Sequence, residues 1–166
     1  MRMQNINLSP HFRLEEFVRS ETATKHGIVN EPPSEAVEAL RKLCVGTLEP
    51  LREALGSPII ITSGYRCKAL NELVVHHSRT SQHMKGQAAD FYIPEVSGNL
   101  SHRERLILAF RTIITNPEVD FDQLILYPNF IHVSFVSRDK NRHGIMTANG
   151  QGTYRAVTRE VALSIQ

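Results

Sequence analysis

The sequence is poor in cysteine, nearly balanced in charge and free of long apolar runs. Its two cysteines, Cys44 and Cys67, are too few for a disulfide framework; they could pair with each other, but we expect both to be free thiols. The formal net charge of +2 gives no sign of nucleic-acid or membrane binding. No stretch approaches the roughly 20 apolar residues that a membrane span requires. With 41% hydrophobic and 22% charged residues, the composition predicts a soluble globular protein.

The first ten residues are polar and lack the apolar core of a secretory signal. We therefore expect a soluble protein made in the cytoplasm, which something else must release if its substrate lies outside; its final compartment stays open. The length of 166 residues suits a single domain over residues 1–166.

Apolar residues at helical spacing predict helices along the chain. A short one covers residues 12–18. A longer one begins with Ser34 as its N-cap, and Pro50 should kink or split it before residues 56–58 (Gly-Ser-Pro) end it. Cys44 lies on the apolar face of this helix, which indicates a buried thiol.

Ser101 and Glu104 form a capping box in front of another predicted helix, which Pro117 ends. The tail beyond Arg138 is polar, with a short helix expected from Thr158.

Four short runs rich in β-branched and aromatic residues predict strands at 59–62, 88–93, 123–127 and 130–136. The last two are separated by Pro128-Asn129 and should form a hairpin. Residues 63–87 are polar and predicted to be irregular. The fold class that follows is α+β, with a small, mostly antiparallel sheet and helices packed on one side.

Three residues offer the ligand types that zinc accepts. His83 and Asp90 are separated by Gly86, which permits a tight turn that brings the two side chains together. On the last predicted strand, His132 lies on the face opposite the apolar Ile131 and Val133, so it should point away from the core. Two histidines and one carboxylate would leave a fourth position open for water, as in catalytic zinc sites.

Spacing alone leaves an ordinary alternative open. The chain has eight histidines, and a histidine among polar residues is usually a solvated side chain. A wider pattern favours the metal site. Residues 81–90 read Ser-x-His-x-x-Gly-x-Ala-x-Asp, and a His-x-Ser follows at residues 132–134.

These motifs resemble those of the zinc D-Ala-D-Ala carboxypeptidases, in the superfamily that shares its fold with the signalling domain of hedgehog proteins. The resemblance covers residues 12–142 and includes FRLEEF at 12–17, EPLR at 49–52, TSGYR at 62–66 and FDQLI at 121–125. It implies a hedgehog/DD-peptidase-like fold and a Zn²⁺ ion held by His83, Asp90 and His132. The activity it implies is hydrolysis of peptidoglycan stem peptides near D-alanine, as a carboxypeptidase or an endopeptidase.

The resemblance also implies roles for residues around the metal. Arg66 matches the arginine that stabilises the developing oxyanion, a task that suits a permanently charged guanidinium. Ser81 matches a serine that binds the substrate near its terminal carboxylate. We assign Tyr127 and Asn129, in the predicted hairpin, to substrate binding. The ordinary alternatives are a surface arginine and a turn serine.

The general base of the family has no counterpart in this sequence. Relatives carry an acidic residue shortly before the last histidine, where this chain has Leu126 and Asn129. Tyr127, with an ordinary pKa of about 10, is a poor base. The substitutes we consider are Asp120, Asp122, Glu72, His76, His77 or activation of water by zinc alone. For Asp122 we favour a structural role.

The missing acid leaves two functions open. The first is a zinc peptidase of peptidoglycan, such as a phage endolysin-like lysis enzyme or an enzyme of wall-fragment turnover in bacteria. The alternative is a zinc-containing binding module for wall peptides or a protein partner. A third idea, nucleic-acid binding through the basic run 138–143, is weak because no aromatic stacking platform accompanies it.

Overall fold

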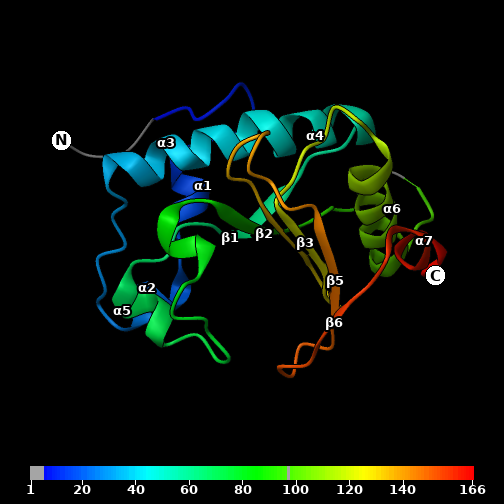
Figure 1. The fold of residues 1–166 in the computed structure, drawn as a ribbon. Helices are drawn as coiled ribbons and strands as arrows, with labels where there is room; N and C mark the ends of the chain where they lie inside the picture. The colour runs from blue at the N-terminus through cyan, green and yellow to red at the C-terminus, as the bar shows by residue number, and fades with distance from the viewer. Residues whose placement is uncertain (1–5, 97) are drawn as a thin grey trace.

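The computed structural model describes residues 6–96 and 98–166, so half of the polar segment 1–10 lies outside the described residues. Its helices are α1 (Leu14–Val18), α2 (Glu21–Lys25), α3 (Ser34–Leu43), α4 (Glu49–Leu55), α5 (Lys68–Glu72), α6 (His102–Thr115) and α7 (Arg159–Ser164), with a π-helical segment η1 (Cys44–Leu48) and a 3-10 helix η2 (Gln82–Lys85). Its strands are β1 (Ile60–Ser63), β2 (Ala88–Tyr92), β3 (Gln123–Leu126), β4 (Ile131–Ser134), β5 (Gly144–Ala148) and β6 (Tyr154–Ala156). The predicted α+β class is confirmed (Figure 1).

The strands form one sheet in the order β1-β2-β4-β3-β5-β6. All neighbours are antiparallel except β3 and β5, which run parallel. The predicted hairpin between β3 and β4 is confirmed. Strands β5 and β6 fall in the polar tail beyond Arg138, for which the sequence had indicated only a short helix. Every residue of the two strands is half-buried or exposed, so neither shows the alternation that marks a strand in sequence.

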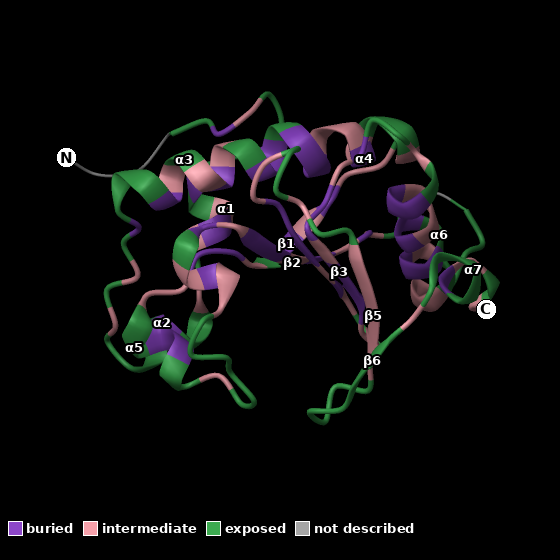
Figure 2. Ribbon diagram, in the orientation of Figure 1, coloured by how far each residue is buried: buried purple, intermediate pink, exposed green. Residues whose placement is uncertain are grey.

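The two faces of the sheet have different neighbours. On one face, Phe91 of β2 and Ile131 and Val133 of β4 are fully buried in the core. Figure 1 shows α3, α4 and α6 along this side, and Figure 2 shows the buried residues gathered there. Successive side chains of a strand point to opposite faces, so Asp90 and His132 lie on the other face. Among the described residues, no layer of helices covers that face, which agrees with the apolar alternation of β4.

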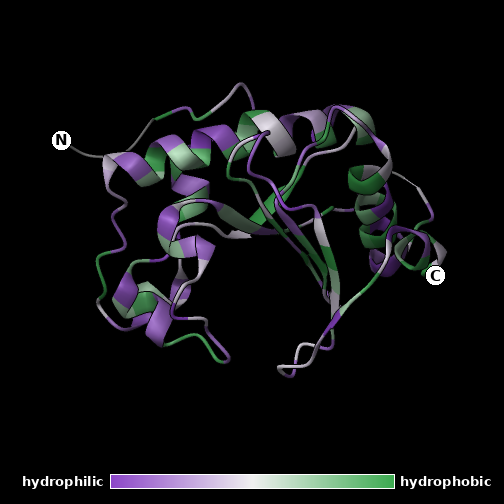
Figure 3. Cartoon of the chain, viewed as in Figure 1, coloured by the Kyte–Doolittle hydropathy of each residue, from purple (hydrophilic) through white to green (hydrophobic). Residues whose placement is uncertain are grey.

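Residues 34–55 form a nearly continuous helical rod, in which polar and apolar residues alternate along α3 (Figure 3). The expected interruption near Pro50 is present, but it begins at Cys44 as the π-helical η1. Proline has no N–H to donate to the carbonyl of Gly46, and this carbonyl instead accepts from the backbone N–H of Asp120 at 3.0 Å. Cys44 is buried and both cysteines are free thiols, as predicted.

Two local predictions are wrong. The N-cap of α3 is Pro33, not Ser34, because the proline holds an extended backbone (φ −67°, ψ 163°) and the helix begins just after it. Residues 63–87 are not wholly irregular, since they contain α5 and η2. Both helices are shorter than two turns, and segments so short carry no full helical period in the sequence.

The remaining helix predictions are confirmed. The capping box of Ser101 and Glu104 starts α6, which ends two residues before Pro117. Thr158 caps α7, and Gly56 ends α4 in the left-handed conformation at φ 59°. Within the described residues, no helix is long and apolar enough to cross a membrane.

Candidate metal centre

The first residue of the site, His83, is held by the turn η2. The Ser81 hydroxyl caps this turn by accepting a hydrogen bond from the His83 backbone N–H at 3.3 Å. Gly86 closes the turn in the left-handed conformation (φ 68°), and a Cβ there would collide with the carbonyl oxygen of Ala36 in α3. The turn is therefore pressed against α3, and the His83 side chain is almost completely buried.

The other two residues, Asp90 and His132, lie directly opposite each other on the paired strands β2 and β4. Because directly opposed residues on paired strands point to the same face, their side chains meet on the open face of the sheet. Both are only slightly exposed, with 16% of the Asp90 side chain and 12% of the His132 side chain accessible. Strand register therefore places two of the three predicted ligands.

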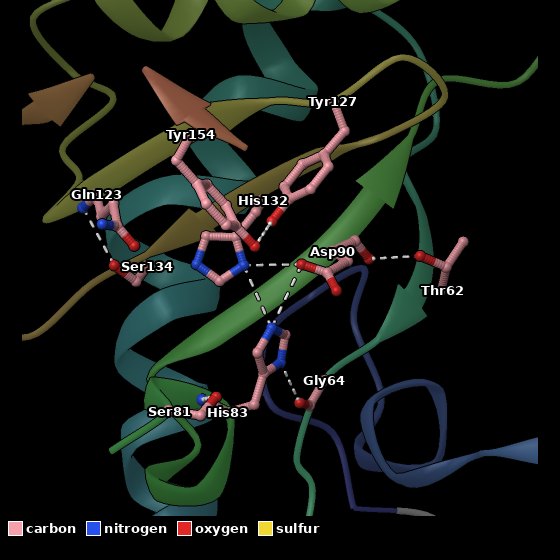
Figure 4. A network of polar contacts seen from close by, with 10 residues as sticks. All are labelled: Thr62, Gly64, Ser81, His83, Asp90, Gln123, Tyr127, His132, Ser134 and Tyr154. Carbon is pink, nitrogen blue, oxygen red and sulfur yellow. Dashed lines mark hydrogen bonds and ion pairs between the residues drawn. The ribbon is translucent and has the colours of Figure 1, made fainter. Parts of the chain in front are cut away.

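The three side chains converge as Figure 4 shows. The His83 Nε2 atom lies 3.2 Å from His132 Nδ1 and 3.3 Å from Asp90 Oδ1, and the last two atoms are 2.8 Å apart. Tetrahedral zinc with ligands at about 2.0–2.1 Å requires separations of about 3.3–3.4 Å between ligand atoms. Two of the three separations fit this requirement, and the third is shorter by about half an ångström.

Hydrogen-bond accounting also points to a cation between these atoms. The His83 Nδ1–H donates to the carbonyl oxygen of Gly64 at 2.7 Å, which leaves Nε2 of the neutral ring as an acceptor. This lone pair faces Asp90, a carboxylate that has no proton to offer. Among the described residues, the donor directed at this lone pair is His132 Nδ1, which lies 3.2 Å away and only 2.8 Å from Asp90 Oδ1. A metal ion between the three atoms would satisfy both the lone pair and the carboxylate.

The directions in which the pKa values of His83 and Asp90 are shifted favour a metal ion over a proton at this site. Burial lowers the pKa of His83, and this effect outweighs the raising influence of Asp90, so the ring is held neutral. Burial alone would raise the pKa of Asp90, but its contacts with the His83 and His132 rings hold it well below its usual range. A neutral imidazole beside an ionised carboxylate is the donor set that a divalent metal binds. His83, Asp90 and His132 are thus fitted to hold a metal ion.

Arg66 lies at the same site, on the loop after β1. Its backbone N–H donates to the His83 carbonyl oxygen at 3.1 Å, which ties this loop to η2. The side-chain Nε is buried and has no hydrogen-bond partner among the described residues. Burial lowers the pKa of the guanidinium, although nearby Asp90 opposes the shift. Arg66 also lines the cavity beside the triad, so the terminal nitrogens of its guanidinium can bind a substrate oxygen there.

A residue that the sequence did not reveal, Asn30, fastens the Arg66 loop. Its Nδ2 donates to the carbonyl oxygens of Val18 and Tyr65 at 2.9 Å, and its Oδ1 accepts from the Cys67 N–H at 2.8 Å. Asn30 is 35 residues away from Tyr65 in sequence, so no local pattern could have indicated this contact.

The triad opens into a groove of about 710 Å³ between the open face of the sheet and the loop 74–82. Ser81 and Tyr127, both predicted to bind substrate, line this groove. Asn129 does not: it is exposed in the β3–β4 turn, where its carbonyl oxygen accepts from His102 at 2.7 Å. The far wall of the groove is formed by residues 146–154 of the β5–β6 hairpin, which was not predicted from the sequence.

The positions at which relatives carry their acid do not supply a base here. Leu126 is buried in the core, on the face opposite the groove. Asp122 is also buried, and its carboxylate accepts hydrogen bonds from Gln82 and Ser134 and from the side chain and backbone of Arg142. The structural role that we favoured for Asp122 fits these contacts.

The other substitutes differ in position. Asp120 pairs with His143 at 2.8 Å, and Glu72 is exposed on α5; neither lines the groove. His76 and His77 do line it, from the loop that follows α5. Of the substitutes considered from sequence, these two histidines are the ones that the structure brings to the groove.

Comparison with known proteins agrees with this geometry. No curated protein matches the chain. The family model described as Peptidase M15 matches residues 10–134, a segment that holds all three candidate ligands and ends at the last residue of β4. Because this match covers well over half of the 166 residues, the chain belongs to the Peptidase M15 family.

Proposed function

We propose that this protein is a zinc-dependent peptidase that hydrolyses peptide-stem bonds of peptidoglycan next to D-alanine. The observation that carries the proposal is the convergence of His83 Nε2, Asp90 Oδ1 and His132 Nδ1 at separations close to those of a tetrahedral site. Family membership supports the peptidase activity. The resemblance to zinc D-Ala-D-Ala carboxypeptidases suggests the metal and the wall-peptide substrate.

The charge of the groove suits such a substrate. Among its described lining residues, Arg142 is paired with Asp122, Arg66 forms no ion pair with a described residue, and Asp90 is a candidate ligand whose charge a bound metal would offset. Peptidoglycan stems carry free carboxylates, and a groove with this balance attracts anionic peptides.

The chemistry divides between the metal and the chain. Zinc held by His83, Asp90 and His132 would supply Lewis acidity and would lower the pKa of a bound water. Gly64 holds the His83 ring in the tautomer that presents Nε2, and Arg66 stabilises the negative charge that develops on the scissile carbonyl. Tyr127 cannot act as the base, because burial and its hydrogen bond to Tyr154 raise its pKa further above neutrality.

The missing acid favours a second candidate, a zinc-containing binding module that recognises wall peptides without cutting them. The groove has no carboxylate apart from Asp90 among its described lining residues. The proton acceptor would then be His76 or His77, or zinc alone would have to activate the water. Nucleic-acid binding gains no support, since Arg142 and His143 of the basic run pair with Asp122 and Asp120.

The deciding experiment measures zinc content and release of D-alanine together. The substrates are purified peptidoglycan and short peptides ending in D-Ala-D-Ala, and the variants are His132→Ala and, as a matched control, the exposed His26→Ala. We expect about one zinc per chain, as one open tetrahedral site predicts, lost with cleavage in His132→Ala and retained in His26→Ala. Zinc bound without any cleavage by the wild type would leave the binding module as the function.

A further inference from the structure

Two tyrosines meet beside the candidate metal ligands. The Tyr127 hydroxyl, at the end of β3, donates a hydrogen bond to the Tyr154 hydroxyl of β6 at 3.0 Å. Tyr127 is itself fixed, because its ring stacks on Phe130 with centroids 4.2 Å apart and planes 14° from parallel. The Tyr154 ring meets the Tyr127 ring edge-on at 6.1 Å. The pair is therefore an ordered feature of the groove wall.

The hydrogen bond leaves Tyr154 with a proton to donate. Its oxygen accepts from Tyr127, and its own O–H finds no acceptor among the described residues. Accepting one hydrogen bond polarises a hydroxyl and strengthens the bond that it donates. Figure 4 shows both hydroxyl groups pointing toward Asp90 and His132. Asp90 and both tyrosines also act on the pKa of Arg66, which places all four groups in one electrostatic neighbourhood.

Tyr154 comes from a part of the chain that the family match does not cover. The match ends at residue 134, and the β5–β6 hairpin follows it. This hairpin also reaches the opposite rim of the groove: a Cβ placed on Gly152 would lie 3.0 Å from the His76 ring. The hairpin thus forms one wall of the groove, contacts the loop of the other wall at His76, and carries Tyr154.

We propose that Tyr154 is a catalytic residue of this peptidase, which donates a hydrogen bond to the scissile carbonyl oxygen as negative charge develops there. It shares this task with Arg66, and Tyr127 is a positioning residue that orients the Tyr154 hydroxyl. This inference rests on the proposed function. It explains why a donor that is unsatisfied within the protein faces the metal ligands from outside the matched segment.

The test compares Tyr154→Phe and Tyr127→Phe with Tyr92→Phe, a control on β2 that does not line the groove. Removing one donor from an oxyanion site typically costs about 10²–10³ in kcat; for the partly exposed Tyr154 we expect a loss of about 10- to 100-fold. KM should stay within about twofold, because the bond strengthens only in the transition state. Tyr127→Phe should lose less, about 3- to 10-fold, since it removes only the orienting bond. Zinc content should match the wild type in all three variants.

A second measurement does not depend on turnover. It determines the Kd of a phosphinate analogue of D-Ala-D-Ala, whose oxygens mimic the tetrahedral oxyanion, on zinc-loaded protein. We expect Tyr154→Phe to weaken this binding about tenfold and to leave binding of the uncleaved peptide nearly unchanged.

The outcomes separate this inference from the proposed function. Cleavage and phosphinate binding equal to wild type in Tyr154→Phe would overturn the role of Tyr154 and leave the peptidase standing. Tyrosine-dependent phosphinate binding in a protein that never cleaves would remove the peptidase and keep Tyr154 as a ligand-binding residue. A zinc-loaded wild type that neither cleaves nor binds the phosphinate overturns both.

Discussion

Asp90 and Asp122 are carboxylates with different partners. Asp90 meets two imidazole nitrogens, and at least one of these is an acceptor when His83 donates to Gly64. Asp122 meets only donors, because Arg142, Gln82 and Ser134 all direct hydrogen to it. A carboxylate whose oxygens are satisfied by donors has no free capacity for a metal or a substrate. The partners, and not the residue type, decide which aspartate serves the site.

Asp122→Asn should destabilise the fold. The substitution replaces a buried charged acceptor of several hydrogen bonds. Because the Arg142 side chain is 65% exposed, solvent weakens the ion pair, and we expect the free energy of unfolding to fall by about 2–3 kcal/mol at pH 7. Burial alone would raise the pKa of Asp122, but its hydrogen bonds with Arg142 and Gln82 lower it. On acidification the unfolded chain therefore takes up this proton first.

The stabilising contribution of Asp122 is thus present at neutral pH and should disappear as the pH falls below about 4, the ordinary pKa of an aspartate. Urea unfolding at pH 7 and pH 3 checks this expectation, since the gap between wild type and variant must narrow at the lower pH. Glu31→Gln, at an exposed carboxylate that makes no side-chain hydrogen bond with a described residue, is the control and should unfold like the wild type. A gap that is equal at both pH values would contradict the assignment.

At the scale of helices and strands, the sequence was informative where elements are long or capped. The capping box of α6 and the alternation of β4 identified those elements, because the relevant interactions lie within a few residues. The short helices α2 and α5 and the strands β5 and β6 escaped. Contacts distant in sequence hold them in place, such as the parallel pairing of β5 with β3.

The residues of the candidate site likewise divide into those that local sequence indicates and those that only distant contacts bring together. Its three ligands could be proposed because two share a short motif and the third lies on a recognisable strand. Asn30 and Tyr154 could not, since each reaches the site through partners 27 to 37 residues away. Asn129, in the turn of the predicted hairpin, is not among the described residues that line the groove.

The turn η2 provides a test at this scale. Gly86→Ala should both strain the backbone at φ 68° and press a Cβ against the Ala36 carbonyl oxygen, displacing His83. Gly27→Ala is the matched control, because Gly27 has a similar φ of 63° but nothing within 4 Å of a Cβ. We expect about 1 kcal/mol of destabilisation for the control and at least twice that for Gly86→Ala. Calorimetry and zinc titration measure both; equal zinc affinity in the two variants would contradict the view that the close packing of η2 on α3 positions His83.

The whole molecule consists of a helical layer on one face of a sheet and a groove on the other. The candidate ligands come from η2, β2 and β4, so a bound ion would link the turn to two central strands. Binding that prefers the folded chain must then raise its stability.

Zinc at 100 times its Kd should add about 2.7 kcal/mol to the free energy of unfolding, or roughly 5–10 °C in Tm for a chain of this size. Scanning calorimetry with zinc and with a chelator measures the shift. His132→Ala should show almost none. A full shift in that variant would mean that zinc binds through other histidines.

The two cysteines of this chain form no disulfide, yet the three ligands offer a cross-link of another kind. His132 is 42 residues from Asp90 and 49 from His83, and a covalent bridge closing such a loop would remove about 4 kcal/mol of entropy from the unfolded chain. A metal ion held by these three residues would also restrict the unfolded chain, but unlike a covalent bridge it can dissociate. Depletion of the ion would loosen the pairing of β2 with β4 and expose the chain to proteolysis, so the lifetime of the protein would follow the supply of metal around it.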